Sequence, residues 1–117
     1  MALTTPERIR SYADLKKGWH YGEGDAIDAE TIRRALLVYA MIETRGFRAT
    51  NSFPGVDGDL MVTAYAEGYY LGIIVKPEEL YDYEYEHEQE MLVDLCDIQL
   101  EEVFIELGQI GFDLPKE

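Results

Sequence analysis

The segment Tyr81-Asp82-Tyr83-Glu84-Tyr85-Glu86-His87-Glu88 alternates ring-bearing and acidic residues along its whole length. Successive side chains of a β-strand point to opposite faces of the sheet. A strand over residues 80–87 therefore places the rings on one face and the carboxylates on the other. This pattern is typical of an antiparallel sheet that has one face packed on a core and one face toward solvent.

The neighbouring segments show the same period of two. Residues 59–66 and 69–75 each alternate along the chain, and Glu67-Gly68 between them predicts a tight turn because glycine accepts a positive φ. Lys76-Pro77-Glu78-Glu79 leads into the acidic strand, and residues 91–95 alternate again. These segments predict a four-stranded antiparallel meander.

Helical spacing and capping residues predict three helices. Thr5-Pro6-Glu7 combines an N-cap, a first-turn proline and an acidic residue that favours the helix dipole. Asp28 and Asp97 are good N-caps for the second and third helices. Gly46 and Gly108 follow the predicted ends of these two helices. The predicted helices span residues 6–14, 29–44 and 98–107.

Residues 90–107 allow a second interpretation, because their polar residues also fit one continuous helix. We favour a strand followed by a helix, since Met91, Val93 and Leu95 alternate with period two. The predicted fold class is α+β, with two N-terminal helices, a four-stranded antiparallel meander and a C-terminal helix packed on the sheet.

The length of 117 residues suits one domain, and we expect residues 1–117 to form it, with residues 1–5 and 109–117 as loosely ordered tails. The formal net charge of −14 argues against direct binding of nucleic acid and of anionic membranes. The single cysteine, Cys96, fits a reducing compartment. No apolar run approaches the roughly 20 residues of a membrane span. We therefore expect a cytoplasmic protein.

The negative charge is concentrated in the second half of the chain. Residues 1–48 hold 8 basic and 7 acidic residues, whereas residues 49–117 hold 17 acidic residues against Lys76 and Lys116. The helical half is thus nearly neutral, and the excess of carboxylates belongs to the predicted sheet and the segment after it.

Two turn and cap motifs carry a resemblance. The loop Trp19-His20-Tyr21-Gly22-Glu23-Gly24-Asp25 precedes the second helix, and Pro54-Gly55-Val56-Asp57-Gly58 precedes the predicted sheet. In these features the sequence resembles a group of small uncharacterised bacterial and phage-type α+β proteins with a Trp-x-x-x-Gly loop, a capped helix and a Pro-x-x-Asp-Gly turn. The resemblance covers about residues 15–107 and implies the architecture only. The tyrosine- and acid-rich third strand departs from the pattern of the group.

The acidic face of residues 81–88 is the candidate functional surface. Its carboxylates lie roughly 6.6–6.8 Å apart along the strand and repel one another unless solvent or a cationic partner screens them. We expect the face to bind a basic protein, as an inhibitor, antitoxin, immunity protein or adaptor does. The predicted contacts are carboxylates and aromatic anchors: Asp82, Glu84, Glu86, Glu88, Tyr81, Tyr83 and Tyr85. The alternatives are a solvated outer face with the tyrosines packed on helices, and a charged edge that prevents aggregation.

Two other functions remain open. The spacing of the carboxylates is close to the phosphate spacing of an extended DNA strand, which fits a nucleic-acid mimic that blocks a nuclease or a DNA- or RNA-binding protein. An exposed strand edge or the tyrosine face also allows a structural homodimer.

The sequence gives little support to catalytic or metal chemistry. His87 and the adjacent glutamates point to opposite faces of the predicted strand and do not converge on a metal. Asp97 follows Cys96 and raises the pKa of its thiol, which is the opposite of activation. We therefore expect no enzyme, no cofactor and no metal. The loop around Trp19 is either an aromatic binding surface or a lid over a helix end.

Overall fold

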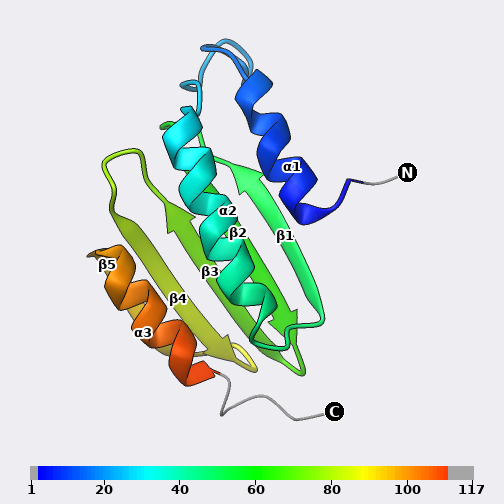
Figure 1. The fold of residues 1–117 in the computed structure, drawn as a ribbon, viewed down its shortest axis with the longest axis vertical. Helices are drawn as coiled ribbons and strands as arrows, with labels where there is room; N and C mark the ends of the chain where they lie inside the picture. Colours follow the sequence, from blue (N-terminus) through cyan, green and yellow to red (C-terminus); the bar gives the residue numbers. More distant parts are fainter. Residues whose placement is uncertain (1–2, 111–117) are drawn as a thin grey trace.

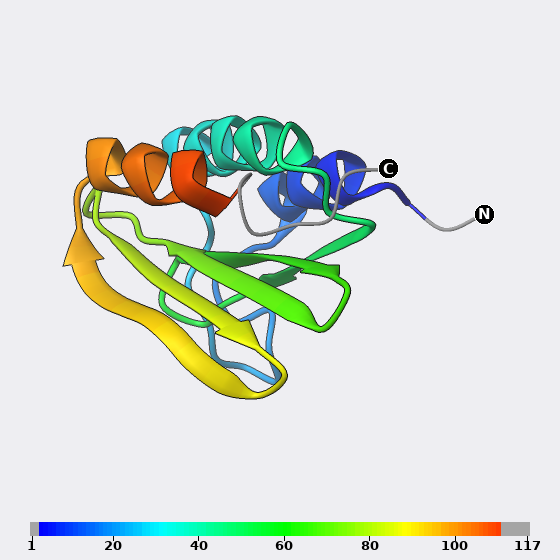
Figure 2. The same cartoon turned by 90° about the horizontal axis from the view of Figure 1, so that it is seen from below.

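The computed structural model describes residues 3–110, which form an α+β fold of one antiparallel sheet and one helix layer (Figures 1 and 2). The sheet has the strand order β1-β2-β3-β4-β5, so strands that are neighbours in space are also neighbours in sequence. All helices of these residues lie on one face of the sheet (Figure 2). The elements are α1 (Thr5–Ser11), the 3-10 helix η1 (Tyr12–Asp14), α2 (Ala29–Glu43), β1 (Ala49–Pro54), β2 (Leu60–Ala66), β3 (Tyr69–Val75), β4 (Tyr81–His87), β5 (Glu90–Ile98) and α3 (Leu100–Ile110).

Tight turns of two residues close the β2–β3 and β4–β5 hairpins of the meander. Glu67 and Gly68 join β2 to β3 with φ values of 50° and 83°, which confirms the predicted turn. Glu88 and Gln89 join β4 to β5 with φ values of 50° and 71°. Positive φ at both positions matches the right-handed twist of the paired strands. Glu88 therefore lies in a turn and not on the face of β4.

The prediction of four strands is wrong, because β1 is a fifth strand that pairs with β2 at the edge of the sheet. Its inward side chains are polar, so it lacks the apolar alternation that marks the other strands. The Thr50 hydroxyl shares a 2.7 Å hydrogen bond with that of Thr5. The hydroxyl of Ser52 shares one of 2.9 Å with that of Tyr12. Side chains of α1 and η1 thus provide hydrogen-bond partners for the inward hydroxyl groups of β1. The other strands make apolar contacts with the helices instead.

The predicted order of strand and then helix holds for residues 90–107, but the boundary differs. Asp97 is not the N-cap of the last helix; it lies in β5 with φ 55°, where the register with β4 shifts. Cys96 and Asp97 together face the single residue Asp82, which makes this irregularity a bulge. The helix α3 begins at Leu100 and continues past Gly108 to Ile110.

The N-terminal cap lies one residue earlier than predicted. Thr4, not Thr5, accepts the backbone N–H of Glu7, whose carboxylate accepts the backbone N–H of Thr4 in return at 2.9 Å. This reciprocal pair is a capping box. Asp28 caps α2 as predicted. Of the two predicted tails, residues 1–2 and 111–117 lie outside the described residues, whereas Ile110 is helical.

The core lies between the helix layer and the covered face of the sheet. Ile9 of α1, Val38 of α2 and Val103 of α3 are fully buried there. The buried strand residues that meet them are Leu60, Val62, Ala64, Leu71, Ile73, Val75, Tyr81, Tyr83 and Tyr85. In Figure 1, α2 lies between α1 and α3, which explains why its apolar face is wider than one stripe.

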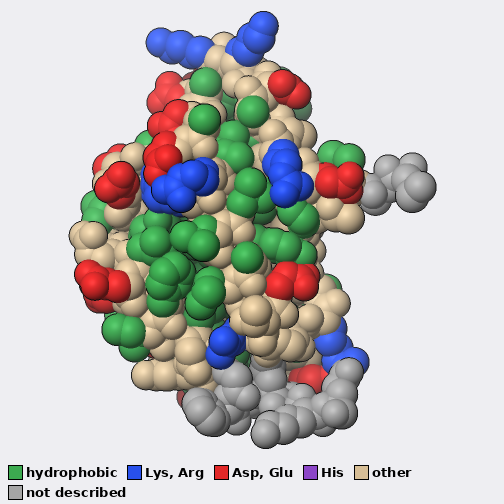
Figure 3. Space-filling view, in the orientation of Figure 1, with side chains coloured by type: hydrophobic (Ala, Val, Ile, Leu, Met, Phe, Trp, Pro, Cys, Tyr) green, Lys and Arg blue, Asp and Glu red, His purple; other side chains and the backbone are tan. Residues whose placement is uncertain are grey.

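The outer surface of the helix layer carries charges of both signs. Figure 3 shows Lys and Arg side chains beside Asp and Glu side chains around a group of hydrophobic side chains. Leu37 of α2 and Ile105 of α3 are among the exposed hydrophobic residues of these helices. The described strand residues on the opposite side of the sheet include acidic but no basic side chains.

Candidate functional site

The side of the sheet that no helix of residues 3–110 covers is here named the open face. Directly paired residues of antiparallel strands point to the same face, so the register assigns its side chains. These are Ala49, Asn51 and Phe53 of β1, Met61, Thr63 and Tyr65 of β2, Tyr70, Gly72 and Ile74 of β3, Asp82, Glu84 and Glu86 of β4, and Met91 and Asp94 of β5. The exposed Cys96 of β5 lies on the same face, beside Asp82 and Asp94.

The open face is divided between an uncharged half and an acidic half. The half formed by β1–β3 carries aromatic side chains, of which Phe53 is 47% and Tyr65 45% exposed. The half formed by β4 and β5 carries carboxylates, and none of the strand residues that the structure describes on this face is basic. The open face therefore combines exposed aromatic surface on one half with negative charge on the other.

Asp82 is occupied within the protein. Its carboxylate lies 3.0 Å from Nζ of Lys76, which also lies 2.7 Å from the Asp97 carboxylate. Asp82 further accepts the backbone N–H of Asp97 at 3.0 Å, across the bulge of β5. The two carboxylates raise the pKa of Lys76, so its ammonium stays charged. These contacts make Asp82 a support of the bulge as well as a member of the acidic half.

Glu84 and Asp94 form the centre of the acidic half. They are direct cross-strand partners on the same face, and like charges in this position repel each other. The hydroxyl of Tyr70 donates to Oε1 of Glu84 at 3.2 Å. Burial, together with the charge of Glu84, raises the pKa of Tyr70 well above its usual range, so the hydroxyl remains a donor. No ion pair joins Glu84 or Asp94 to a basic side chain within residues 3–110.

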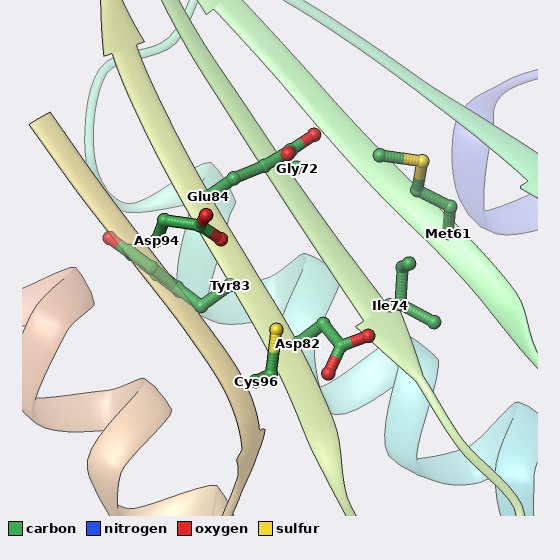
Figure 4. A pocket seen from close by; sticks show the side chains of 8 residues that line it. All are labelled: Met61, Gly72, Ile74, Asp82, Tyr83, Glu84, Asp94 and Cys96. Atoms are coloured by element: carbon green, nitrogen blue, oxygen red, sulfur yellow. The ribbon is translucent and has the colours of Figure 1, made fainter. Parts of the chain in front are cut away.

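A small depression of about 120 Å³, here named the Gly72 hollow, opens between the two halves (Figure 4). Its lining includes Met61 and Ile74 from β2 and β3, and Asp94 and Cys96 from β5. The side chain of Glu84 reaches from β4 across to β3, so that its carboxylate lies over Gly72. A Cβ at position 72 would lie 2.7 Å from the tip of Met61, so the absence of a side chain at Gly72 leaves room for that tip at the edge of the hollow. Cofactor sites usually measure about 300–1,000 Å³, so this one suits the end of a side chain.

A wider groove of about 480 Å³ continues along the open face toward the β4–β5 turn. It is lined by aromatic rings of β2 and β3 and by Glu84, Glu86 and Glu88. The structure thus brings three of the four predicted carboxylates to one groove. Glu88 reaches this groove from the turn rather than from the strand face, as its positive φ of 50° requires.

The prediction that Tyr81, Tyr83 and Tyr85 act as aromatic anchors is wrong for this structure. Their exposed fractions are 1%, 1% and 3%, because they project into the core between the sheet and the helices. Aromatic side chains do face solvent on the open face, but they come from the neighbouring strands. Tyr65 and Tyr70 are the clearest, with ring centroids 5.2 Å apart.

Sequence reasoning missed Asp94, Tyr70 and Gly72 as members of the site. The polar position of Asp94 between Val93 and Leu95 was a sufficient signal, because alternation assigns it to the face opposite these apolar residues. No comparable signal marks Gly72. Its role follows from three side chains of different strands that converge over its Cα, and only the register reveals this.

His87 and Cys96, the two candidates for catalytic chemistry, lie at opposite ends of the β4–β5 hairpin. His87 stacks on the ring of Tyr69 with centroids 4.0 Å apart, at the end of β4. Cys96 is exposed on the open face, and the charge of Asp82 is the main cause that raises the pKa of its thiol. Within residues 3–110, no group of three or more His, Cys, Asp or Glu side chains is placed to hold a metal ion.

The loop around Trp19 folds onto itself. The indole Nε1 donates to the backbone carbonyl of Asp25 at 2.9 Å, and the ring covers Gly24, where a Cβ would lie 2.8 Å from Nε1. Trp19 therefore closes its own loop rather than a helix end. Tyr21 at the tip of the loop is 95% exposed.

Comparison of the chain with protein-family models, with curated proteins and with solved structures found no match. The resemblance to a group of small bacterial and phage-type proteins therefore stays a prediction. In the part of the chain that the structure describes, no helix is long and apolar enough to cross a membrane.

Proposed function

We propose that the protein binds a basic protein partner through the acidic half of the open face, as an inhibitor, antitoxin, immunity protein or adaptor would. One observation carries this proposal. Glu84, Glu86 and Asp94 lie together on a sheet face that no described helix covers, and the strand residues of that face include no cation.

The arrangement of these carboxylates favours binding over a purely structural role. Glu84 opposes Asp94 directly, and a like-charged cross-strand pair costs roughly 0.2–1 kcal/mol of stability. A solvated outer face that serves only solubility has no need of this pairing. A cationic partner converts the repulsion into attraction and gains association rate from the field of the whole acidic half.

Equal changes of charge at two places test the proposal. The open-face variant carries Glu84→Gln, Glu86→Gln and Asp94→Asn. The matched control carries Asp14→Asn, Glu78→Gln and Glu101→Gln, which lie in η1, the β3–β4 loop and α3 and are exposed. Fluorescence anisotropy of a labelled hexalysine peptide at low ionic strength measures the affinity of each protein.

The open-face variant should bind the peptide about tenfold more weakly, if each lost charge pair contributes about 0.5 kcal/mol. The control should stay within about twofold of the unchanged protein. Equal losses in the two variants would show that net charge alone attracts the peptide, and would overturn the proposal.

A nucleic-acid mimic is the special case in which the basic partner is itself a nucleic-acid-binding protein. The carboxylates of Asp82, Glu84 and Glu86 follow one strand in line, which is the observation in favour of this case. Competition separates it from other partners. Duplex DNA or RNA should displace the protein from such a partner, whereas a partner that binds nucleic acid elsewhere or not at all is retained.

A further inference from the structure

The Gly72 hollow has walls of two opposite chemistries. Met61 and Ile74 supply apolar surface from β2 and β3, whereas Glu84 and Asp94 supply carboxylates from β4 and β5 (Figure 4). A ligand that matches both walls has an apolar stem and a cationic end. Lysine side chains have this form, and they commonly bury the stem along apolar surface while the ammonium meets polar groups.

The size and the charges of the hollow favour the end of one side chain. Its volume is about 120 Å³, whereas one water molecule takes up about 30 Å³ of the liquid, so the hollow has room for a few atoms only. Lys76 already neutralises the Asp82 carboxylate at one side of the hollow. Glu84 and Asp94 remain to receive a cation from outside.

The two carboxylates suit an ammonium better than a guanidinium. Arginine binds best where one carboxylate offers both oxygens to its planar fork. Here Oε1 of Glu84 already accepts the hydroxyl of Tyr70, and the second carboxylate comes from another strand. An ammonium has three donors around a compact centre and can contact both carboxylates at once.

We propose that the Gly72 hollow receives a lysine side chain of the basic partner, with its methylene groups against Met61 and Ile74 and its ammonium between Glu84 and Asp94. The inference rests on the proposed function. It adds a specific contact to a surface whose negative charge alone does not define which groups of the partner it touches. It also gives the glycine a role, since a side chain at position 72 would displace the tips of Met61, Tyr70 and Glu84 that border the hollow.

The length of the cationic side chain tests this contact at constant charge. The probes are three peptides, acetyl-Dab-Gly-X-Gly-Dab-amide, in which the flanking residues are always 2,4-diaminobutyrate (Dab) and X is lysine, ornithine or Dab. The side chains at X carry the same ammonium on four, three and two methylene groups. Amide chemical shifts of the ¹⁵N-labelled full chain give the affinity of each peptide, with the Gly72 amide as the local reporter.

Affinity should fall about twofold to fourfold for each methylene removed, as expected for a stem that loses apolar contact. Equal affinities for the three peptides, with shift changes still confined to the open face, would overturn the proposed lysine contact in the Gly72 hollow. The proposed function would not be affected by that result. Shifts that avoid the open face altogether would overturn both.

The variant Gly72→Ala provides a second test that leaves the charge unchanged. The new methyl group would meet only the tips of flexible side chains, at 2.7 Å from Met61 Cε and Tyr70 Oη and 3.0 Å from Glu84 Oε1, so these can move into the hollow. We expect the variant to bind all three peptides equally, at the level of the shortest one. Retained dependence on stem length in a folded variant would place the contact elsewhere.

Discussion

The two faces of β4 carry side chains of opposite character. Tyr81, Tyr83 and Tyr85 are almost completely buried, whereas the residues between them, Asp82, Glu84 and Glu86, lie on the open face. One strand thus supplies large side chains to the core and charges to the surface. The comparison separates positions where a change affects folding from positions where it affects binding.

The tyrosines show why the covered face accepts polar rings. The hydroxyl of Tyr81 accepts a hydrogen bond of 3.3 Å from Arg34, a buried side chain of α2. Tyr85 stacks on Tyr69 with ring centroids 5.6 Å apart. Tyr81 therefore contributes apolar area and keeps a partner for its hydroxyl, and Tyr85 contributes a stacked ring. Both act as core residues here rather than as anchors for another protein.

The largest effect is expected on the covered face. Tyr83→Ala removes a fully buried ring and should lower the free energy of unfolding by about 3–5 kcal/mol, as other large-to-small core substitutions do. Urea denaturation followed by circular dichroism measures it. A loss below about 1 kcal/mol would contradict the assignment of this face to the core.

The next effect concerns Arg34, which links the helix layer to the end of the sheet. Its guanidinium donates to the backbone carbonyl of Lys76 at 2.9 Å and to the hydroxyl of Tyr81. Arg34→Met leaves these buried acceptors without their donor and should cost about 1–3 kcal/mol in the same denaturation experiment. An unchanged midpoint would mean that other donors replace the guanidinium.

Lys76 supports the bulge from the loop before β4. Lys76→Met removes its ion pairs with Asp82 and Asp97 and leaves the two carboxylates to repel each other. We expect a loss of about 1 kcal/mol, which is the upper range for a pair near the surface. Added salt should reduce the difference between the variant and the unchanged protein, and a difference independent of salt would argue against an electrostatic cause.

On the open face, the sign of the effect on stability should be reversed. Glu84→Gln removes the repulsion with Asp94 and should raise the free energy of unfolding by about 0.5 kcal/mol, while it weakens peptide binding. Calorimetric melting at low salt measures the gain, with Glu78→Gln in the β3–β4 loop as the control. A loss of stability in Glu84→Gln would show that the carboxylate supports the fold.

The smallest effect is a shift in the titration of Cys96. The negative charge of Asp82 disfavours the thiolate and raises the pKa of the Cys96 thiol. Asp82→Asn should lower this pKa, so the rate of alkylation by iodoacetamide at mildly alkaline pH should rise, because the thiolate is the reacting form. An unchanged pH profile would mean that the field of the acidic half does not reach the thiol.

The comparison of the two faces also explains how far the sequence predicts the structure. The strict alternation in residues 81–87 predicts β4 and its two chemistries, because period two assigns each side chain to a face. β1 could not be predicted in this way, because Thr50 and Ser52 point inward and form hydrogen bonds with residues 45 and 40 positions earlier in the chain.

The site could be predicted only in part for the same physical reason. The carboxylates of β4 follow from one strand, but Asp94 joins them through pairing, and the Gly72 hollow requires three strands in register. Asp97 was expected to cap a helix, yet its positive φ of 55° forms a bulge held by Asp82 and Lys76. Contacts of this kind depend on how strands pair, and the residues next to them in the sequence do not indicate them.

The most direct test of the central claim is the location of amide shift changes when hexalysine peptide is added to the ¹⁵N-labelled protein. Binding through the acidic half predicts that the changes gather in β3, β4 and β5, with the largest near Glu84 and Asp94, and that the open-face variant loses them. Changes centred on α2 and α3, or spread evenly over the acidic residues of the whole chain, would contradict the account.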